Sequence, residues 1–139
     1  MRDLHFPGRS PVLATGGMCA TSHPLAARVA VQMLEAGGNA MDAALAGAVL
    51  LGFCEPQMTG LGGDLFALVA RDAHADIEAL NGSGRAPAAL SAEALRAEGL
   101  SAMQVDKAAS VTIPGAVDAI CSLAASHGSL PLSTILAPA

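Results

Sequence analysis

The residues whose types and spacing best suit chemistry form the glycine-rich segment 60–64, Gly-Leu-Gly-Gly-Asp, which continues into the apolar segment 65–69. A phosphate-binding loop is excluded, because no Lys-Ser or Lys-Thr pair follows the glycines and the apolar segment predicts a strand rather than a helix. The glycines fit either a tight bend in which backbone approaches backbone or the wall of an active site. Asp64 either binds a polar group at the mouth of such a site or caps the N–H groups of the loop, and we favour the capping role.

Thiols and imidazoles offer little further chemistry. Cys19, Cys54 and Cys121 are far apart and odd in number, which predicts free thiols, and their apolar neighbours predict that these thiols are buried. The four histidines are isolated and lack the spacing of metal ligands, so neither a metal site nor a cofactor is predicted. A catalytic pair of Cys54 with His74 would have no third group to orient it.

The elements that position the glycine-rich segment begin with a strand predicted over 11–15 and a helix. Ser22 as N-cap, with proline in the first turn, predicts the start of this helix, and Gly37-Gly38 predicts its end. Its apolar face is predicted from helical spacing to consist of Leu25, Val29, Met33 and Ala36.

A second helix is predicted directly afterwards. Asn39 is its expected N-cap, with Asp42 placed where a carboxylate meets the free N–H groups of the first turn. From Ala43 onward the residues are apolar all round, which predicts burial on every side. The helix is expected to end before Pro56.

The rest of the chain predicts a hairpin followed by two helices. Strands over 65–70 and 76–80 would be joined by a turn at 71–74, with irregular backbone at 81–84. A helix is then predicted over 92–98, capped by Ser91 and stopped by Gly99, and an extended segment at 110–113. A further helix is predicted from Pro114 to Gly128, and the residues on its apolar face are Val117, Ile120, Cys121 and Ala124. The tail over 129–139 contains no clear element.

The composition predicts one domain with faces that pack on further segments. The chain has 139 residues, of which 53% are hydrophobic and only 14% charged, against about 25% charged residues in typical domains. A domain of this size hides such an apolar excess poorly, although an alanine-rich chain that folds alone is the alternative. The net charge of −5 and the scattered Lys and Arg residues exclude nucleic acid as a partner.

Targeting signals are not visible in the sequence. Residues 1–10, which we predict to be a loose arm, contain no apolar run of the kind found in secretory signals. The longest uncharged run, residues 43–54, is shorter than the roughly twenty residues that a membrane helix needs. We therefore expect a soluble, cytoplasmic protein with no membrane partner.

Six short motifs in order resemble the N-terminal part of the large subunit of the gamma-glutamyltranspeptidase family, whose members are N-terminal-nucleophile hydrolases. The motifs are Ser22 to Ala26, Gly37 to Ala44, Glu55-Pro56 with Gly60 to Val69, Ala86-Pro87, Ile113 to Gly115, and His127 to Pro131. The final segment, Leu136 to Ala139, also has a counterpart, so that the resemblance covers about residues 12–139. The resemblance implies an α+β fold, namely an incomplete N-terminal portion of a four-layer αββα sandwich, so that residues 1–139 form a partial domain.

The segment 81–87, Asn-Gly-Ser-Gly-Arg-Ala-Pro, departs from the pattern of relatives that act on gamma-glutamyl compounds. Those relatives have an arginine three residues before the Ala of Ala-Pro, followed by an acid, and the arginine binds the substrate's α-carboxylate through its planar guanidinium. Here Ser83 and Gly84 hold those places, and an arginine follows as Arg85. The resemblance implies that Arg85 and Ser83 bind substrate, as in a branch similar to oxamate amidohydrolases, while the alternative for Arg85 is a surface ion pair.

The resemblance also implies what the chain would do. The family's nucleophile is a threonine further along, freed by self-cleavage so that its own amine acts as base, so no catalytic residue is assigned in residues 1–139. We expect a scaffold segment whose partner is a small subunit carrying the nucleophile, in an enzyme for amide hydrolysis or acyl transfer on a small amide or gamma-glutamyl substrate. The alternatives are a catalytically silent truncated remnant and an interaction or binding module.

Overall fold

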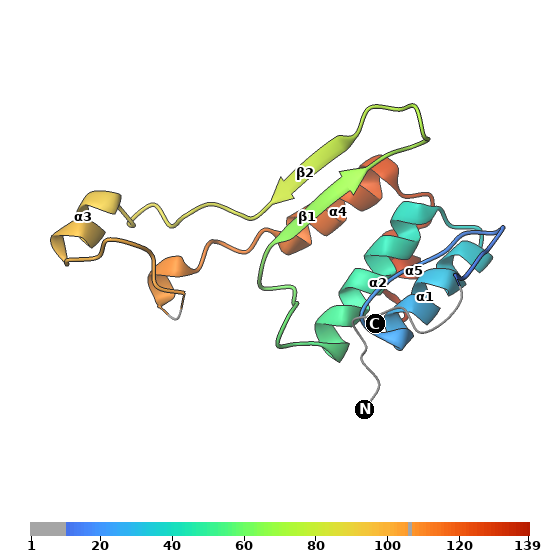
Figure 1. Cartoon of the computed structure of the whole chain (residues 1–139), viewed down its shortest axis with the longest axis horizontal. Coiled ribbons are helices and arrows are strands. Elements are labelled where there is room, and N and C mark those ends of the chain that lie inside the picture. The colour runs from blue at the N-terminus through green and yellow to red at the C-terminus, as the bar shows by residue number, and fades with distance from the viewer. Residues whose placement is uncertain (1–10, 106) are drawn as a thin grey trace.

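The computed structural model describes residues 11–105 and 107–139, so the arm predicted at 1–10 lies outside the described residues. A layer of helices packs against one face of an antiparallel hairpin, and a long arm projects from their junction (Figure 1). The elements in chain order are α1 (Pro24–Glu35), α2 (Ala40–Cys54), β1 (Leu65–Val69), β2 (Glu78–Gly82), α3 (Ala92–Ala97), the 3-10 turn η1 (Ala108–Ser110), α4 (Ala116–His127) and α5 (Leu132–Leu136).

Helix α1 forms where predicted but with a different cap. His23 is the N-cap and its Nδ1 accepts from the N–H of Leu25 at 3.3 Å, while the predicted cap, Ser22, donates its hydroxyl to Glu55 at 2.7 Å. Val29 and Met33 are buried as predicted, but the other buried residues of this face are Ala26 and Ala30 rather than Leu25 and Ala36. Leu25 and Ala36 are exposed, because α2 approaches from the side of the helix where the small alanines lie.

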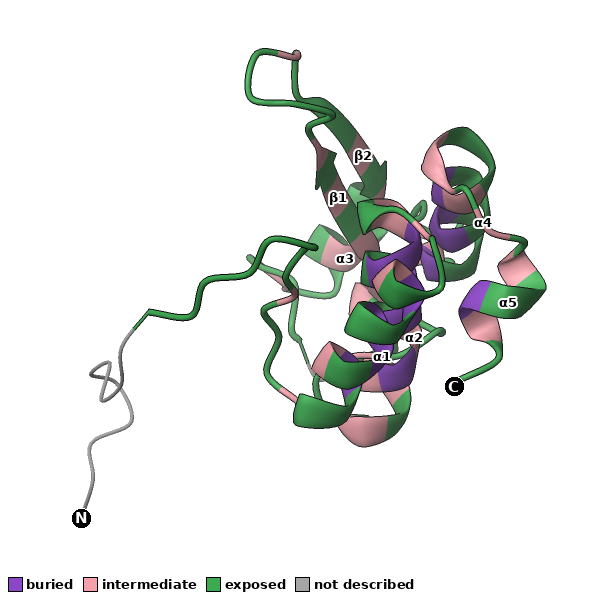
Figure 2. Cartoon of the chain, turned by 90° about the vertical axis from the view of Figure 1, so that its right-hand side faces the viewer, coloured by how far each residue is buried: buried purple, intermediate pink, exposed green. Residues whose placement is uncertain are grey.

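Helix α2 begins with the predicted cap. Asn39 Oδ1 accepts from the N–H groups of Met41 and Asp42, and Asp42 accepts in return from the N–H of Asn39. The prediction that α2 is buried on every side is wrong for this chain, since Phe53 is 80% exposed. The other elements cover only one side of α2, and Figure 2 shows its buried residues facing α1, α4 and α5.

The predicted hairpin is confirmed, with its second strand two residues later than expected. Leu65 pairs with Gly82 and Val69 with Glu78, so the segment predicted as irregular contributes to β2. One face of the hairpin, including Leu65, Ala67 and Leu80, packs on the helical core, while Phe66 on the other face is 67% exposed. The strand predicted at 11–15 does not form, and no other strand lies beside that segment in the part of the chain that is described.

The C-terminal part contains one helix that the sequence pattern did not predict. Helix α5 falls in the tail predicted to be irregular, and its Ile135 is fully buried against the core formed with α2 and α4. Helix α4 ends at Gly128 as predicted, although two residues of its predicted face, Val117 and Cys121, are exposed. The segment predicted as extended at 110–113 forms no strand.

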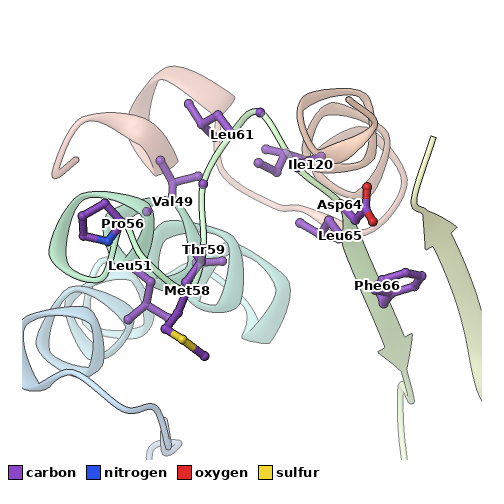
Figure 3. A pocket seen from close by; sticks show the side chains of 16 residues that line it. Val49, Leu51, Pro56, Met58, Thr59, Leu61, Asp64, Leu65, Phe66 and Ile120 are labelled. Atoms are coloured by element: carbon purple, nitrogen blue, oxygen red, sulfur yellow. The ribbon is translucent and has the colours of Figure 1, made fainter. Parts of the chain in front are cut away.

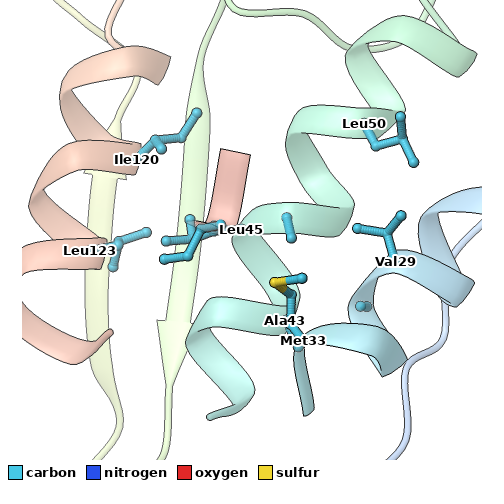
Figure 4. Packing of buried hydrophobic residues seen from close by; sticks show 10 residues of the cluster. Val29, Met33, Ala43, Leu45, Leu50, Ile120 and Leu123 are labelled. Atoms are coloured by element: carbon cyan, nitrogen blue, oxygen red, sulfur yellow. The ribbon is translucent and has the colours of Figure 1, made fainter. Parts of the chain in front are cut away.

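The core lies between α1, α2, α4 and α5, and one face of the hairpin packs against it (Figure 4). Its buried members are Val29, Ala30, Met33, Ala43, Leu45, Ala46, Leu50, Ile120, Leu123 and Ile135. The three cysteines are free, as predicted, but they are not buried: Cys121 is exposed and the other two are half-buried. None of the helices in the described residues has the length and apolar character to cross a membrane.

Candidate substrate-binding site

Three segments that are far apart in the sequence meet beside the N-terminal end of α4. They are the glycine-rich loop 60–64, the loop 82–85 at the end of β2, and the segment 112–116 that leads into α4; we call this meeting point the three-segment junction. The first two N–H groups at the start of α4 donate to the carbonyl of Gly63 at 3.2 and 3.0 Å. Two of the free N–H groups of this helix end are thereby satisfied by the glycine-rich loop.

Close backbone packing at the junction explains the glycines of its second and third segments. Gly84 has a φ of +74°, and a side chain there would overlap the carbonyl of Ile113. Gly115 packs in the same way against the carbonyl of Gly82. In contrast, a Cβ atom at Gly60 or Gly62 would meet open space, so the tight approach predicted for the glycine-rich loop is found instead in the other two segments.

Thr112 joins the other two segments through its side chain. Its hydroxyl oxygen lies 2.8 Å from the carbonyl oxygen of Ser83 and 3.2 Å from Oδ1 of Asp64. Asp64 is exposed and its carboxylate accepts no hydrogen bond from the N–H groups of the glycine-rich loop, so the favoured capping role is wrong. The sequence contains no signal that connects these three positions, and the contact was not predicted.

The structure places Ser83 and Arg85 together at the rim of the junction. Ser83 is half-buried, and its N–H donates to Asn81 Oδ1 at 3.0 Å. The backbone of Arg85 is fixed, because its carbonyl accepts from the N–H of Ile113 at 2.9 Å. The guanidinium of Arg85 is in solvent and forms no ion pair with an acid of the described residues, so the predicted alternative of a surface ion pair is not observed there.

A cavity of about 720 Å³ lies beside the junction, between α2, the glycine-rich loop, the start of β1 and α4. Its walls are mainly apolar, and Val49, Leu61 and Ile120 reach it from α2, the loop and α4 (Figure 3). Asp64 is the one charged residue among those that line it.

The Cys54 and His74 pair considered from the sequence does not form in the structure. Cys54 and His74 form no hydrogen bond with each other, and the N–H of His74 instead donates to Asp72 at 2.8 Å. No group of three His, Cys, Asp or Glu residues that could hold a metal ion is found in residues 11–105 and 107–139.

A second cluster of polar groups, which surrounds Asp42, stabilises the fold. The Asp42 side chain is fully buried and accepts from the hydroxyl of Ser129 at 2.6 Å, from the N–H of Ser129 at 3.0 Å and from the N–H of Leu130 at 3.3 Å, besides its bond from Asn39. Burial by itself raises the pKa of the Asp42 carboxyl, but the hydrogen bonds from Ser129, Asn39 and Leu130 together outweigh it and hold the pKa below its ordinary value. This ionised carboxylate fastens the start of α2 to the turn between α4 and α5.

Comparison with known proteins agrees with the resemblance described above. Residues 26–139 match the gamma-glutamyltranspeptidase family. The chain is 34% identical to the glutathione hydrolase-like YwrD proenzyme of Bacillus subtilis, over 92% of this chain and 24% of that protein. It is 39% identical to the acylase ACY 1 proenzyme of a Pseudomonas species, over 94% of this chain and 25% of that protein. The chain thus spans about a quarter of the length of the curated relatives it matches.

The fold of this chain also agrees with that of solved gamma-glutamyltranspeptidase structures. The gamma-glutamyltranspeptidase structure of Helicobacter pylori superposes with a TM-score of 0.81 at 29% identity, over 92% of this chain and 38% of that one. The predicted α+β class and the identification with an N-terminal part of this fold are confirmed.

Proposed function

Because the chain belongs to the gamma-glutamyltranspeptidase family, we propose that it is the N-terminal segment of an enzyme that hydrolyses amides or transfers their acyl groups. In this proposal a threonine outside residues 1–139 attacks the amide carbonyl, an acyl-enzyme forms, and water or an amine releases the acyl group. The present chain provides the scaffold and one wall of the substrate site. No cofactor takes part.

The substrate that we propose is a small amide that carries a carboxylate, rather than glutathione. The observation that carries this proposal is the loop 82–85, in which Ser83 and Gly84 stand where relatives that act on gamma-glutamyl compounds have an arginine and an acid. Arg85 follows on a backbone fixed by Ile113, and its guanidinium, which has no acidic partner in residues 11–105 and 107–139, can bind a carboxylate through two parallel hydrogen bonds.

The partner that we propose is the remainder of such an enzyme. Phe53 on α2 is 80% exposed, and Phe66 and Leu68 on the outer face of the hairpin are 67% and 77% exposed. Isolated exposed apolar residues are ordinary, but adjacent bulky residues on one sheet face mark a surface that packs on something else. The relatives are longer proenzymes, which fits a segment that works as one part of a larger assembly.

Hydrolysis assays on two forms of the protein test the proposal. The 139-residue chain is compared with the chain followed by the sequence that its gene encodes downstream, using oxamate and a gamma-glutamyl anilide as substrates. We expect activity only in the longer form, with oxamate preferred. Faster turnover of the gamma-glutamyl anilide would contradict the proposed substrate class, and activity of the short chain would contradict the assignment of the nucleophile to another segment.

A further inference from the structure

We propose that Thr112 is a positioning residue, whose hydroxyl holds the loop that carries Arg85 and couples that loop to Asp64. Its relevance to catalysis rests on the proposed function, because it acts through Arg85, but the contact itself can be tested without any assay of activity. The oxygen-to-oxygen distances are 2.8 Å to the carbonyl of Ser83 and 3.2 Å to Asp64 Oδ1. Thr112 is half-buried and β-branched, so its side chain has few rotamers available and the hydroxyl is held in place.

The Thr112 hydroxyl has a single proton and two acceptors within reach. The shorter distance favours the carbonyl of Ser83 as the main acceptor of this proton, and the carboxylate of Asp64 is the competing acceptor. A ligand group that donates a hydrogen bond to the Asp64 carboxylate occupies this competing acceptor. The Thr112 hydroxyl then donates to the carbonyl of Ser83 alone. Occupation of the cavity rim at Asp64 therefore favours an ordered loop 82–85.

The ordering effect of the Thr112 hydroxyl reaches Arg85 through a very short stretch of chain. Thr112 bonds to the carbonyl of Ser83, and the next residue, Ile113, bonds to the carbonyl of Arg85 at 2.9 Å. The backbone on both sides of Gly84 is thus held by consecutive residues of one segment. Loss of the hydroxyl leaves the Ile113 bond alone to fix the direction of Arg85.

Limited trypsin digestion of the 139-residue chain reports on this contact, because the bond after Arg85 is exposed and is followed by alanine. Cleavage of a transiently opened loop follows the population of the open form. We expect Thr112→Val to raise the rate of cleavage after Arg85 about fivefold, as loss of one ordinary hydrogen bond implies. Thr112→Ser keeps the hydroxyl and should stay within about twofold of the wild type on the same basis.

Controls separate a local effect from a general one. Thr134→Val makes the same chemical change at an exposed position of α5 and should leave the cleavage after Arg85 unchanged. Cleavage after Arg71, at the far end of the hairpin, and after Arg28, within α1, should not rise in Thr112→Val. An unchanged rate at Arg85, or an equal rise at Arg28, overturns the proposal.

The variant Asp64→Asn tests which acceptor receives the proton of the Thr112 hydroxyl. The new amide N–H can donate to the Thr112 oxygen while the hydroxyl remains with Ser83, so cleavage after Arg85 is expected at or below the wild-type rate. A clear rise overturns the assignment of the proton to Ser83.

In the longer form of the protein, Thr112→Val is expected to raise KM for oxamate about fivefold with little change in kcat, and Thr112→Ser to restore KM. A change confined to kcat overturns the positioning role. A wild-type enzyme that hydrolyses neither substrate refutes the proposed function while the digestion result stands.

Discussion

Replacement of Asp42 by asparagine is the perturbation whose size the structure defines best. The two carboxylate oxygens of Asp42 both face backbone donors: one accepts from the N–H of Asn39, and the other from the N–H groups of Ser129 and Leu130. In whichever orientation the asparagine is placed, its amide nitrogen points at a backbone N–H and cannot accept from it. At least one hydrogen bond to a charged group is lost in a fully buried position.

The expected cost follows from these contacts. A hydrogen bond to a charged group contributes about 1.5–3 kcal/mol, and the unpaired donor adds a further penalty, so we expect a loss of about 3 kcal/mol in the free energy of unfolding. For a chain of this size that corresponds to a fall in Tm of about 10 °C. Urea unfolding of the 139-residue chain at pH 7, followed by circular dichroism, measures the loss. Asp76→Asn in the exposed hairpin turn is the matched control and should stay within about 0.5 kcal/mol of the wild type.

The dependence on pH gives this prediction a second test. The pKa of Asp42 in the folded state is lower than in the unfolded state, so the folded state binds fewer protons between the two values. Its contribution is complete above the unfolded value, about 3.9, and is lost as the pH falls through the folded value. The gap in stability between the wild type and Asp42→Asn should therefore shrink below about pH 4. A gap under 1 kcal/mol at pH 7, or one that does not change on acidification, would refute the reasoning.

Three further outcomes are expected. Ile135→Ala should lower the free energy of unfolding by about 2–4 kcal/mol in urea titrations, because the side chain is fully buried, and a loss below 1 kcal/mol would mean that α5 does not cover the core. Gly84→Ala should raise trypsin cleavage in loop 82–85, since its positive φ and the nearby Ile113 carbonyl leave no place for a methyl group, whereas Gly60→Ala should not change it. In the longer form, Arg85→Ala should raise KM for oxamate about tenfold or more, with only partial recovery in Arg85→Lys; an unchanged KM would remove Arg85 from the site.

Local signals in the sequence predicted the ends of several helices correctly. Asn39 and Ser91 cap the helices that follow them, and Gly128 ends α4, because each of these contacts lies within one helical turn. Ser22 failed as a cap because a distant acid, Glu55, binds its hydroxyl instead. Local chemistry alone does not decide between two partners for one hydroxyl.

The parts that sequence reasoning missed depend on contacts between distant residues. The second strand extends to Gly82 because its pairing with Leu65 sets the register. Helix α5 is only one turn long and follows a proline, and the burial of Ile135 stabilises it. The motif around Arg85 is visible in the sequence, but the attachment of Arg85 to Ile113 and the link from Thr112 to Asp64 arise only when the three segments meet.

The arm that carries α3 leaves the domain after Arg85 and returns at Thr112, and the two ends of this excursion are tied together by the bond between Ile113 and Arg85. Residues 86–111 are therefore a closed loop on a fixed base. The entropy of closing such a loop grows only slowly with its length. Insertions and deletions within the arm should be tolerated with little effect on the junction, so this is where homologous chains are free to differ in length and where a reporter or an affinity tag is best inserted.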